Sequence, residues 1–88
     1  MSVITYGYDL LTGVKTLVAP ASASVQKVRV HNHEHNQNHD IFLGNADVTV
    51  SNGMHLVATE TTEMQLLPGD DLYAVASQNC NLRVLVIR

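Results

Sequence analysis

The stretch LLPGDDLYAVASQNCNLRVLVI, residues 66–87, decides the fold class of this chain. It holds two short, mostly apolar runs, LYAVAS at 72–77 and LRVLVI at 82–87, and turn residues precede each run. Pro68-Gly69-Asp70 is a typical turn, because proline presets one backbone dihedral and glycine accepts a left-handed one. Short aliphatic and β-branched runs bounded in this way predict strands.

The same alternation of apolar runs and turn residues extends to the N-terminus. Turn signals recur about every 8–12 residues, which is typical of a sandwich or barrel. We therefore predict an all-β fold, a single small jelly-roll-like β-sandwich of about 7–8 antiparallel strands. The predicted strands span residues 3–8, 14–18, 25–33, 39–43, 55–59, 63–67, 72–77 and 82–87.

Residues 54–67 allow a second interpretation, because their apolar positions have a weak helical spacing. Thr59, Thr61 and Thr62 argue against a helix, since β-branched side chains lose rotamer freedom there. We interpret this window as two strands.

The length of 88 residues fits a single domain, 1–88. Within it, residues 1–24 form an N-terminal strand or arm region, and residues 25–88 form the core that carries the motifs. A chain this short buries only about 60–65% of its unfolded surface, so contact with a partner would add useful stability.

The composition argues against several classes of protein. Only 5 lysines and arginines are scattered along the chain, against 8 acidic residues, which is not the pattern of a nucleic-acid-binding surface. Cys80 is the only cysteine, so neither an intrachain disulfide nor a cysteine zinc cluster is expected. Neither a membrane-spanning run nor a leader pattern is found, so we expect a soluble protein made in the cytoplasm.

The last run, LRVLVI, is apolar on both faces. Leu82, Val84 and Val86 point to one side of a strand, whereas Leu85 and Ile87 point to the other. Both faces of this strand are therefore expected to be buried.

The N-terminal run SVITYGY also places apolar side chains together, since Ile4, Tyr6 and Tyr8 share a face. The run is either an edge strand lying over the sandwich or a subunit contact. The interface candidates are Val3, Ile4, Tyr6, Tyr8, Leu85 and Ile87.

Four of the five histidines fall in HNHEHNQNH, residues 31–39. Neutral imidazole is a good ligand for zinc, copper or nickel, and histidines at i and i+2 of a strand project to one face. A third ligand would have to come from the returning strand, from His39 or Asp40, and the candidate metal ligands are His31, His33 and His39. The alternative is the polar rim and tip of a β-hairpin.

The hairpin register separates these two interpretations. A three-residue loop would set His33 opposite His39 but turn Ile41 and Leu43 toward solvent. A loop with an even number of residues keeps those two side chains inside, which is worth about 1.5–3 kcal/mol for each of them. We therefore favour a polar hairpin, with no metal and no other cofactor.

The even register also sorts the neighbouring side chains. It turns Phe42 outward and Asn32 inward. Its predicted core-facing residues are Val28, Val30, Ile41 and Leu43, and its outward residues are Arg29, His31, His33 and Asp40. Whether the histidine-rich hairpin 31–39 has a binding or pH-sensing role is left open, since clustered imidazoles gaining charge near pH 6 would repel one another.

His31-Asn32-His33 also resembles the opening of the first sequence motif of the cupins. The second cupin motif supplies another histidine shortly after a proline–glycine turn, and residues 68–73 contain none. The resemblance is partial, and it implies a small metal-binding or enzymatic protein as the alternative.

The sequence lacks the common catalytic motifs, including GxSxG, the P-loop and GxGxxG. Asp70-Asp71 pairs two carboxylates, but a Pro-Gly-Asp sequence is an ordinary turn. We predict no catalytic residue and no enzymatic activity.

A more specific resemblance covers about the C-terminal half of the chain. IFLGNADVTVSNGMHLV, residues 41–57, is followed by LLPGDDLYAVAS and then by LRVLVI. This order of motifs is similar to that of a family of small β-sandwich proteins from tailed phages and prophages. The matching residues are Phe42, Leu43, Gly44, Asp47, Val48, Thr49, Asn52, Gly53, Leu56, Pro68, Gly69, Asp70, Leu72, Tyr73, Ala74 and Val75.

The matching residues have scaffold roles. Gly44 and Gly53 are expected to take positive φ where strands turn. Asp47 and Asn52 are expected to bond neighbouring amides as Asx turns, and Pro68 to preset its turn.

The resemblance implies a virion structural protein without catalytic residues. The expected role is capsid decoration or cementing, by a homo-oligomer, with a trimer as first guess, that binds the major capsid protein on the outer surface of the capsid. Avidity among many copies would supply the affinity. A head-fibre or tail-associated attachment module is the nearest alternative, and no nucleic-acid or membrane partner is expected.

Overall fold

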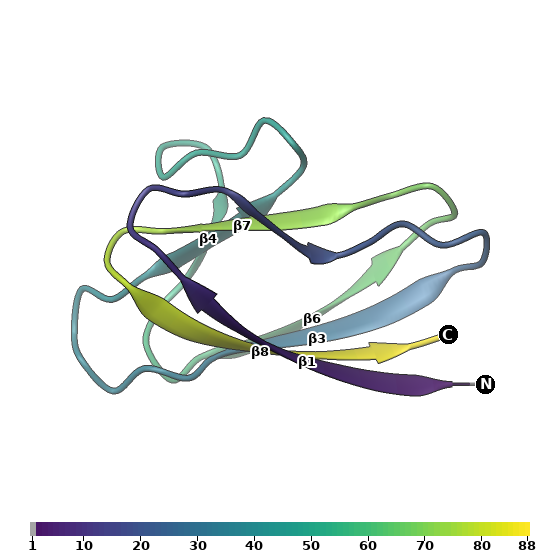
Figure 1. The fold of residues 1–88 in the computed structure, drawn as a ribbon, viewed down its shortest axis with the longest axis horizontal. Helices are drawn as coiled ribbons and strands as arrows, with labels where there is room; N and C mark the ends of the chain where they lie inside the picture. Colours follow the sequence, from purple (N-terminus) through teal and green to yellow (C-terminus); the bar gives the residue numbers. More distant parts are fainter. Residues whose placement is uncertain (1) are drawn as a thin grey trace.

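The computed structural model describes residues 2–88, which form eight strands and no helix. Figure 1 shows the strands in two layers, with the two chain ends side by side. One sheet has the order β1-β8-β3-β6 and is called the first sheet; the second sheet has the order β2-β7-β4-β5. The strands are β1 (Val3–Leu10), β2 (Thr16–Ala19), β3 (Gln26–Asn32), β4 (Ile41–Gly44), β5 (Met54–Leu56), β6 (Thr61–Leu66), β7 (Leu72–Ala76) and β8 (Cys80–Ile87).

The topology is that of a jelly roll. Successive strands cross from one sheet to the other except β4 and β5, which pair as neighbours in the second sheet. The strand pairings in both sheets are antiparallel. The predicted all-β jelly-roll-like sandwich is confirmed, and residues 54–67 are two strands, β5 and β6, as interpreted from their threonines.

Aliphatic side chains fill the space between the sheets. β3 follows a strict alternation of buried and less buried residues, with Val28 and Val30 fully buried. β4 contributes Ile41 and Leu43 from the opposite sheet. Residues 1–24 also supply core side chains, among them Leu10 and Val18. The N-terminal quarter is therefore part of the sandwich.

The predicted hairpin between β3 and β4 is wrong. β3 pairs with β6 and β8 in the first sheet, whereas β4 pairs with β5 and β7 in the second. The segment between them crosses the end of the sandwich. This crossing buries the same four aliphatic residues as the even hairpin register would, because β3 and β4 face each other across the interior. The predicted inward Asn32 is confirmed, and Phe42 is only half-buried.

Two of the predicted turn roles also need correction. Gly44 and Gly53 have ordinary φ, and the glycines with positive φ are Gly13 and Gly69. Gly44 and Gly53 are needed for space, since a Cβ atom on either would lie within 3.0 Å of the Val48 side chain.

The Asx turn in this region is made by a different residue. The Asn45 Oδ1 accepts a hydrogen bond from the Asp47 N–H at 2.9 Å, so Asn45 takes the role expected of Asp47. Asn52 bonds a neighbouring amide as predicted, since its Oδ1 accepts from the Thr49 N–H at 2.8 Å.

No helix among residues 2–88 is long and apolar enough to cross a membrane.

Candidate functional site

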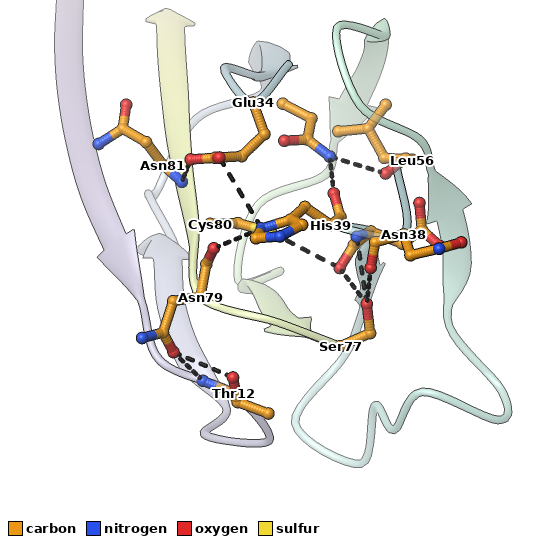
Figure 2. Close-up of polar contacts among 11 residues, drawn as sticks. Thr12, Glu34, Asn38, His39, Leu56, Ser77, Asn79, Cys80 and Asn81 are labelled. Carbon is orange, nitrogen blue, oxygen red and sulfur yellow. Dashed lines mark hydrogen bonds and ion pairs between the residues drawn. The ribbon is translucent and has the colours of Figure 1, made fainter. Parts of the chain in front are cut away.

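The histidine-rich segment lies in the connection between β3 and β4, and side-chain hydrogen bonds hold this connection to the sandwich (Figure 2). The Glu34 carboxylate accepts a hydrogen bond from the Asn81 N–H at 2.9 Å. The backbone N–H of His33 donates to the Asn81 carbonyl at 2.8 Å. The start of the connection is thus fixed to the start of β8.

His39 belongs to the same network. Its Nδ1 lies 3.1 Å from the Asn79 carbonyl oxygen, a distance at which the ring donates a hydrogen bond, and 3.9 Å from a Glu34 oxygen. The Asn79 side chain in turn accepts from the Thr12 N–H at 2.9 Å and from the Thr12 hydroxyl at 3.0 Å. His39 therefore links the connection to two further loops, which is a structural task.

Ser77 closes the other end of the connection. Its hydroxyl donates to the Asn38 carbonyl at 3.0 Å and accepts from the Asp40 N–H at 3.1 Å. Beyond it, the Asp40 carboxylate lies 3.2 Å from Nε2 of His55, whose ring stacks on Phe42 with centroids 4.8 Å apart. The outward Phe42 thus finds a partner within the chain.

Asn32 is the buried polar residue at the end of β3. Its Nδ2 donates to the carbonyls of His39, at 2.9 Å, and Leu56, at 3.1 Å. Within residues 2–88 its buried Oδ1 has no hydrogen-bond partner. The amide ties the crossing connection to β5 from inside the sandwich.

The three candidate metal ligands are not brought into one group. The His31 and His33 rings lie 5.5 Å apart on the surface, and His31 Nδ1 is 2.8 Å from the Thr61 hydroxyl. His39 is held by Asn79, as described above. Within residues 2–88, no cluster of three or more histidine, cysteine or acidic side chains is arranged to share an ion. His35 continues the surface row, with its ring 6.0 Å from that of His33.

Cys80 is buried beneath this network. Its Sγ lies 3.9 Å from the Asp40 carbonyl. Burial raises the pKa of the thiol to about 11, and the nearby carboxylates of Glu34 and Asp40 act in the same direction. A thiol held in this state is a poor nucleophile at neutral pH.

The six interface candidates divide between two faces of the first sheet. Ile4, Tyr6 and Tyr8 point inward and pack, partly buried, against the core. Val3, which is 62% exposed, points to the opposite side of the sheet, and so does Ile87, its partner on β8. That side, which points away from the second sheet, is called the outer face. It carries Val3, Thr5, Gly7, Asp9, Asn81, Arg83, Leu85, Ile87, Lys27, Arg29, His31, Thr61, Glu63 and Gln65.

The outer face combines an apolar strip with positive charge. Leu85 and Ile87 are only half-buried there, so the prediction that both faces of the last strand are buried holds in part. Lys27, Arg29 and Arg83 flank this strip, and Arg29 is paired with Glu63 at 2.9 Å. Three of the 5 basic residues of the chain thus share one face.

A shallow hollow of about 370 Å³ lies on the outer face. Gly7, Arg83 and His31 stand side by side across three strands at its border. The absence of a side chain on Gly7 leaves room beside the Arg83 side chain, whose Nε donates to the Asn81 Oδ1 at 2.6 Å. Arg29 points outward as predicted. Arg83 and its grouping with Arg29 were not predicted, although the i, i+2 spacing of Lys27 with Arg29 and of Arg83 with Leu85 was a usable signal.

Comparison with known proteins gives the fold. No protein-family model and no curated sequence matches the chain. The structure is similar to the cupin domain of an XRE-family transcriptional regulator from Enterobacter cloacae, with a TM-score of 0.58 and 10% identity over 98% of this chain and 81% of that one.

Two further similar structures come from other settings. The stem and receptor-binding domain of spike protein P1 from bacteriophage PM2 has a TM-score of 0.57 and 19% identity over 89% of this chain and 30% of that one. A de novo designed double-stranded β-helix has a TM-score of 0.54 and 7% identity over 98% and 96%. At these identities the likeness shows an architecture, the jelly roll or double-stranded β-helix, that cupins and a phage spike domain share.

Proposed function

We propose that this protein is a non-enzymatic structural component of a tailed-phage virion. Its specific role would be that of a capsid decoration or cement protein, made in the host cytoplasm, that self-associates and binds the major capsid protein on the outer surface of the shell. The observation that carries this proposal is the outer face of the first sheet, where Val3, Leu85 and Ile87 form an apolar strip flanked by basic side chains.

Three features support an assembly role over a catalytic one. Aliphatic side chains fill the space between the sheets, and the polar groups near the histidines hold the connection between β3 and β4 in place. The motifs at 41–57 and 66–87 resemble phage structural proteins. The PM2 spike domain has a similar architecture, which makes a virion role compatible with the fold.

Binding to shells assembled from the major capsid protein of the parent phage tests the proposal. Leu85→Glu should reduce co-sedimentation with these shells about tenfold or more, because it places a charge in the middle of an apolar contact. Gln65→Glu is the matched control, since it adds the same charge at the far edge of the same sheet. Equal binding by wild type and Leu85→Glu would contradict this docking face, and no binding by the wild type would contradict the decoration role. In that case a cryo-EM map of the parent particle would distinguish a head-fibre or tail position.

A metal-binding role of cupin type is the second candidate. It is favoured by the cupin likeness of the fold and by the 5.5 Å separation of the His31 and His33 rings. These two rings point away from the interior, because Asn32 between them points inward. Titration of the purified protein with zinc or nickel, followed by calorimetry, tests it. Tight 1:1 binding that His33→Asn abolishes would support the cupin-type role.

A further inference from the structure

The outer edge of β1 has hydrogen-bonding groups without a partner among residues 2–88. β1 stands at the end of the first sheet and pairs only with β8. The Ser2 N–H donates to the Arg88 carbonyl at 2.5 Å and the Arg88 N–H donates to the Ser2 carbonyl at 3.0 Å, so these residues are a hydrogen-bonded pair. Such pairs alternate along an antiparallel ladder. The residues of β1 whose N–H and C=O groups point away from β8 are therefore Val3, Thr5, Gly7 and Asp9.

This edge differs from the other three edges of the sandwich. β2 has 4 residues and a register irregularity after Leu17, and β5 has only 3 residues. β6, at the opposite end of the first sheet, carries Glu63 in an ion pair. β1 has 8 residues, no proline, no lysine and an unbroken register with β8, and its one charged residue, Asp9, lies next to its end and accepts a hydrogen bond from the Asn81 side chain. Short, irregular or charged edges resist pairing with another chain, whereas a long regular edge is a template for it.

The side chains beside this edge would gain cover from another strand. On the outer face Val3 is 62% exposed. On the inner face Ile4, Tyr6 and Tyr8 are only partly buried, and the Tyr6 and Tyr8 rings lie 5.9 Å apart. A strand laid along β1 would cover apolar groups on both sides of the sheet at once.

We infer that the partner of this edge is the β1 edge of a second copy of the chain, paired antiparallel around a twofold axis. This inference deepens the self-association part of the proposed function by naming its contact. In such a pair, the numbers of two facing residues always add up to the same sum. Only an even sum sets odd-numbered residues opposite odd-numbered ones, which keeps the same face of both strands on one side of the sheet and brings the outward N–H and C=O groups together. A register centred on Tyr6 meets both conditions, and it sets Ile4 opposite Tyr8 and Thr5 opposite Gly7.

The pairing has consequences for the assembly. The two first sheets join into one continuous sheet, and the apolar strips of the two outer faces become neighbours. Because the contact uses the same patch on both subunits, it closes as a dimer. It therefore replaces the threefold arrangement that the phage resemblance suggests.

A proline substitution tests the edge without touching the β8 ladder. Thr5→Pro removes one outward N–H, and proline is tolerated on edge strands at such positions. Gln65→Pro is the matched control. The Asn32 N–H donates to the Glu60 carbonyl, so the even-numbered residues of β6 bond to β3, and the N–H of Gln65 points away from β3. Sedimentation equilibrium over a range of concentrations should show dimers for wild type and Gln65→Pro, and self-association weakened about tenfold or more for Thr5→Pro.

Residue-resolved amide hydrogen exchange on the wild type gives a second readout that needs no variant. In the dimer, the amides of Thr5 and Gly7 should be protected like those of Tyr6 and Tyr8. On dilution to monomer, protection should be lost at Thr5 and Gly7, and at Val3 and Asp9 near the ends of the pairing, and kept at Tyr6 and Tyr8. A wild-type monomer at the highest concentration, a trimer, or a folded Thr5→Pro that dimerises as tightly as the wild type would overturn the inference. These measurements use pure protein without capsid shells, so their failure is distinct from a failure of shell binding.

Discussion

At Gly53 a Cβ atom would lie 2.7 Å from the Cβ of Phe42, 2.8 Å from a methyl group of Val48 and 3.1 Å from the Thr49 carbonyl oxygen. Two of these neighbours are backbone or the first atom of a side chain, which cannot swing away. Gly53→Ala should therefore lower the free energy of unfolding by about 1–3 kcal/mol, the usual cost of overpacking.

Gly7→Ala is the control for this substitution. The nearest atom to a Cβ there is the Arg83 Cδ at 3.7 Å, an ordinary contact at the end of a flexible side chain. Urea unfolding of both variants makes the comparison. Equal losses of stability would show that the crowding around Gly53 relaxes.

The raised pKa of Cys80 predicts how the stability of the protein changes at alkaline pH. Its thiol has a pKa of about 11 in the folded protein against an ordinary value of 9.0. A raised folded pKa means that the unfolded chain loses its proton first. The contribution of Cys80 to stability is therefore full below pH 9 and declines as the pH rises through 11.

Cys80→Ala isolates this contribution. Its loss of stability relative to wild type should shrink between pH 9 and pH 11, as measured by urea unfolding at several pH values. Tyr8, whose pKa burial also raises, is present in both proteins and cancels from the difference. A difference that does not change with pH would contradict the assigned state of the thiol.

At the scale of elements, the strands were predictable from their local pattern, whereas the order in which they pair was not. The turn at Pro68-Gly69 bounds β7, and alternation along 25–33 predicts which side chains of β3 are buried. The hairpin prediction used the same alternation. However, Val30 and Ile41 are buried equally well whether β3 and β4 pair in one sheet or face each other from two sheets. What decides the choice is the pairing of β3 with β6 and β8, strands far away in sequence.

The connection 33–40 illustrates the same limit for side chains. Its histidines were predicted to be polar and outward, and this holds for His33 and His35, which are on the surface. The role of Glu34 and His39 was not predictable, because their partners are Asn79 and Asn81 near the start of β8.

The histidines should therefore differ in their effect on stability. Replacing His31, His33 and His35 together by asparagine should change the melting temperature little near neutral pH, since surface substitutions are usually within about 0.5 kcal/mol. His39→Ala should cost about 1 kcal/mol, because it leaves the Asn79 carbonyl without its donor. Differential scanning calorimetry makes the comparison, and a larger loss for the triple variant would reverse the assignment.

At the scale of the whole molecule, charge is unevenly distributed. The chain has a net charge of −3, yet the outer face carries three basic residues, Lys27, Arg29 and Arg83, against two acidic ones, Asp9 and Glu63. The acidic residues Asp47, Asp70 and Asp71 belong to loops outside the first sheet. Such an arrangement favours an acidic partner surface opposite the outer face, and it would orient the protein as it approaches a capsid shell.

Lys27→Gln tests this orientation, with Lys15→Gln as the control. Both variants remove one positive charge, but Lys15 precedes β2 in the second sheet and donates to the Ala46 carbonyl there. Shell binding at low salt should fall several-fold for Lys27→Gln and stay unchanged for Lys15→Gln. The difference should shrink near 1 M salt, where the screening length is only about 3 Å. Equal losses of shell binding by both variants would mean that binding depends on the net charge of the protein and not on the position of the charge. This result would contradict the assignment of the outer face as the docking surface.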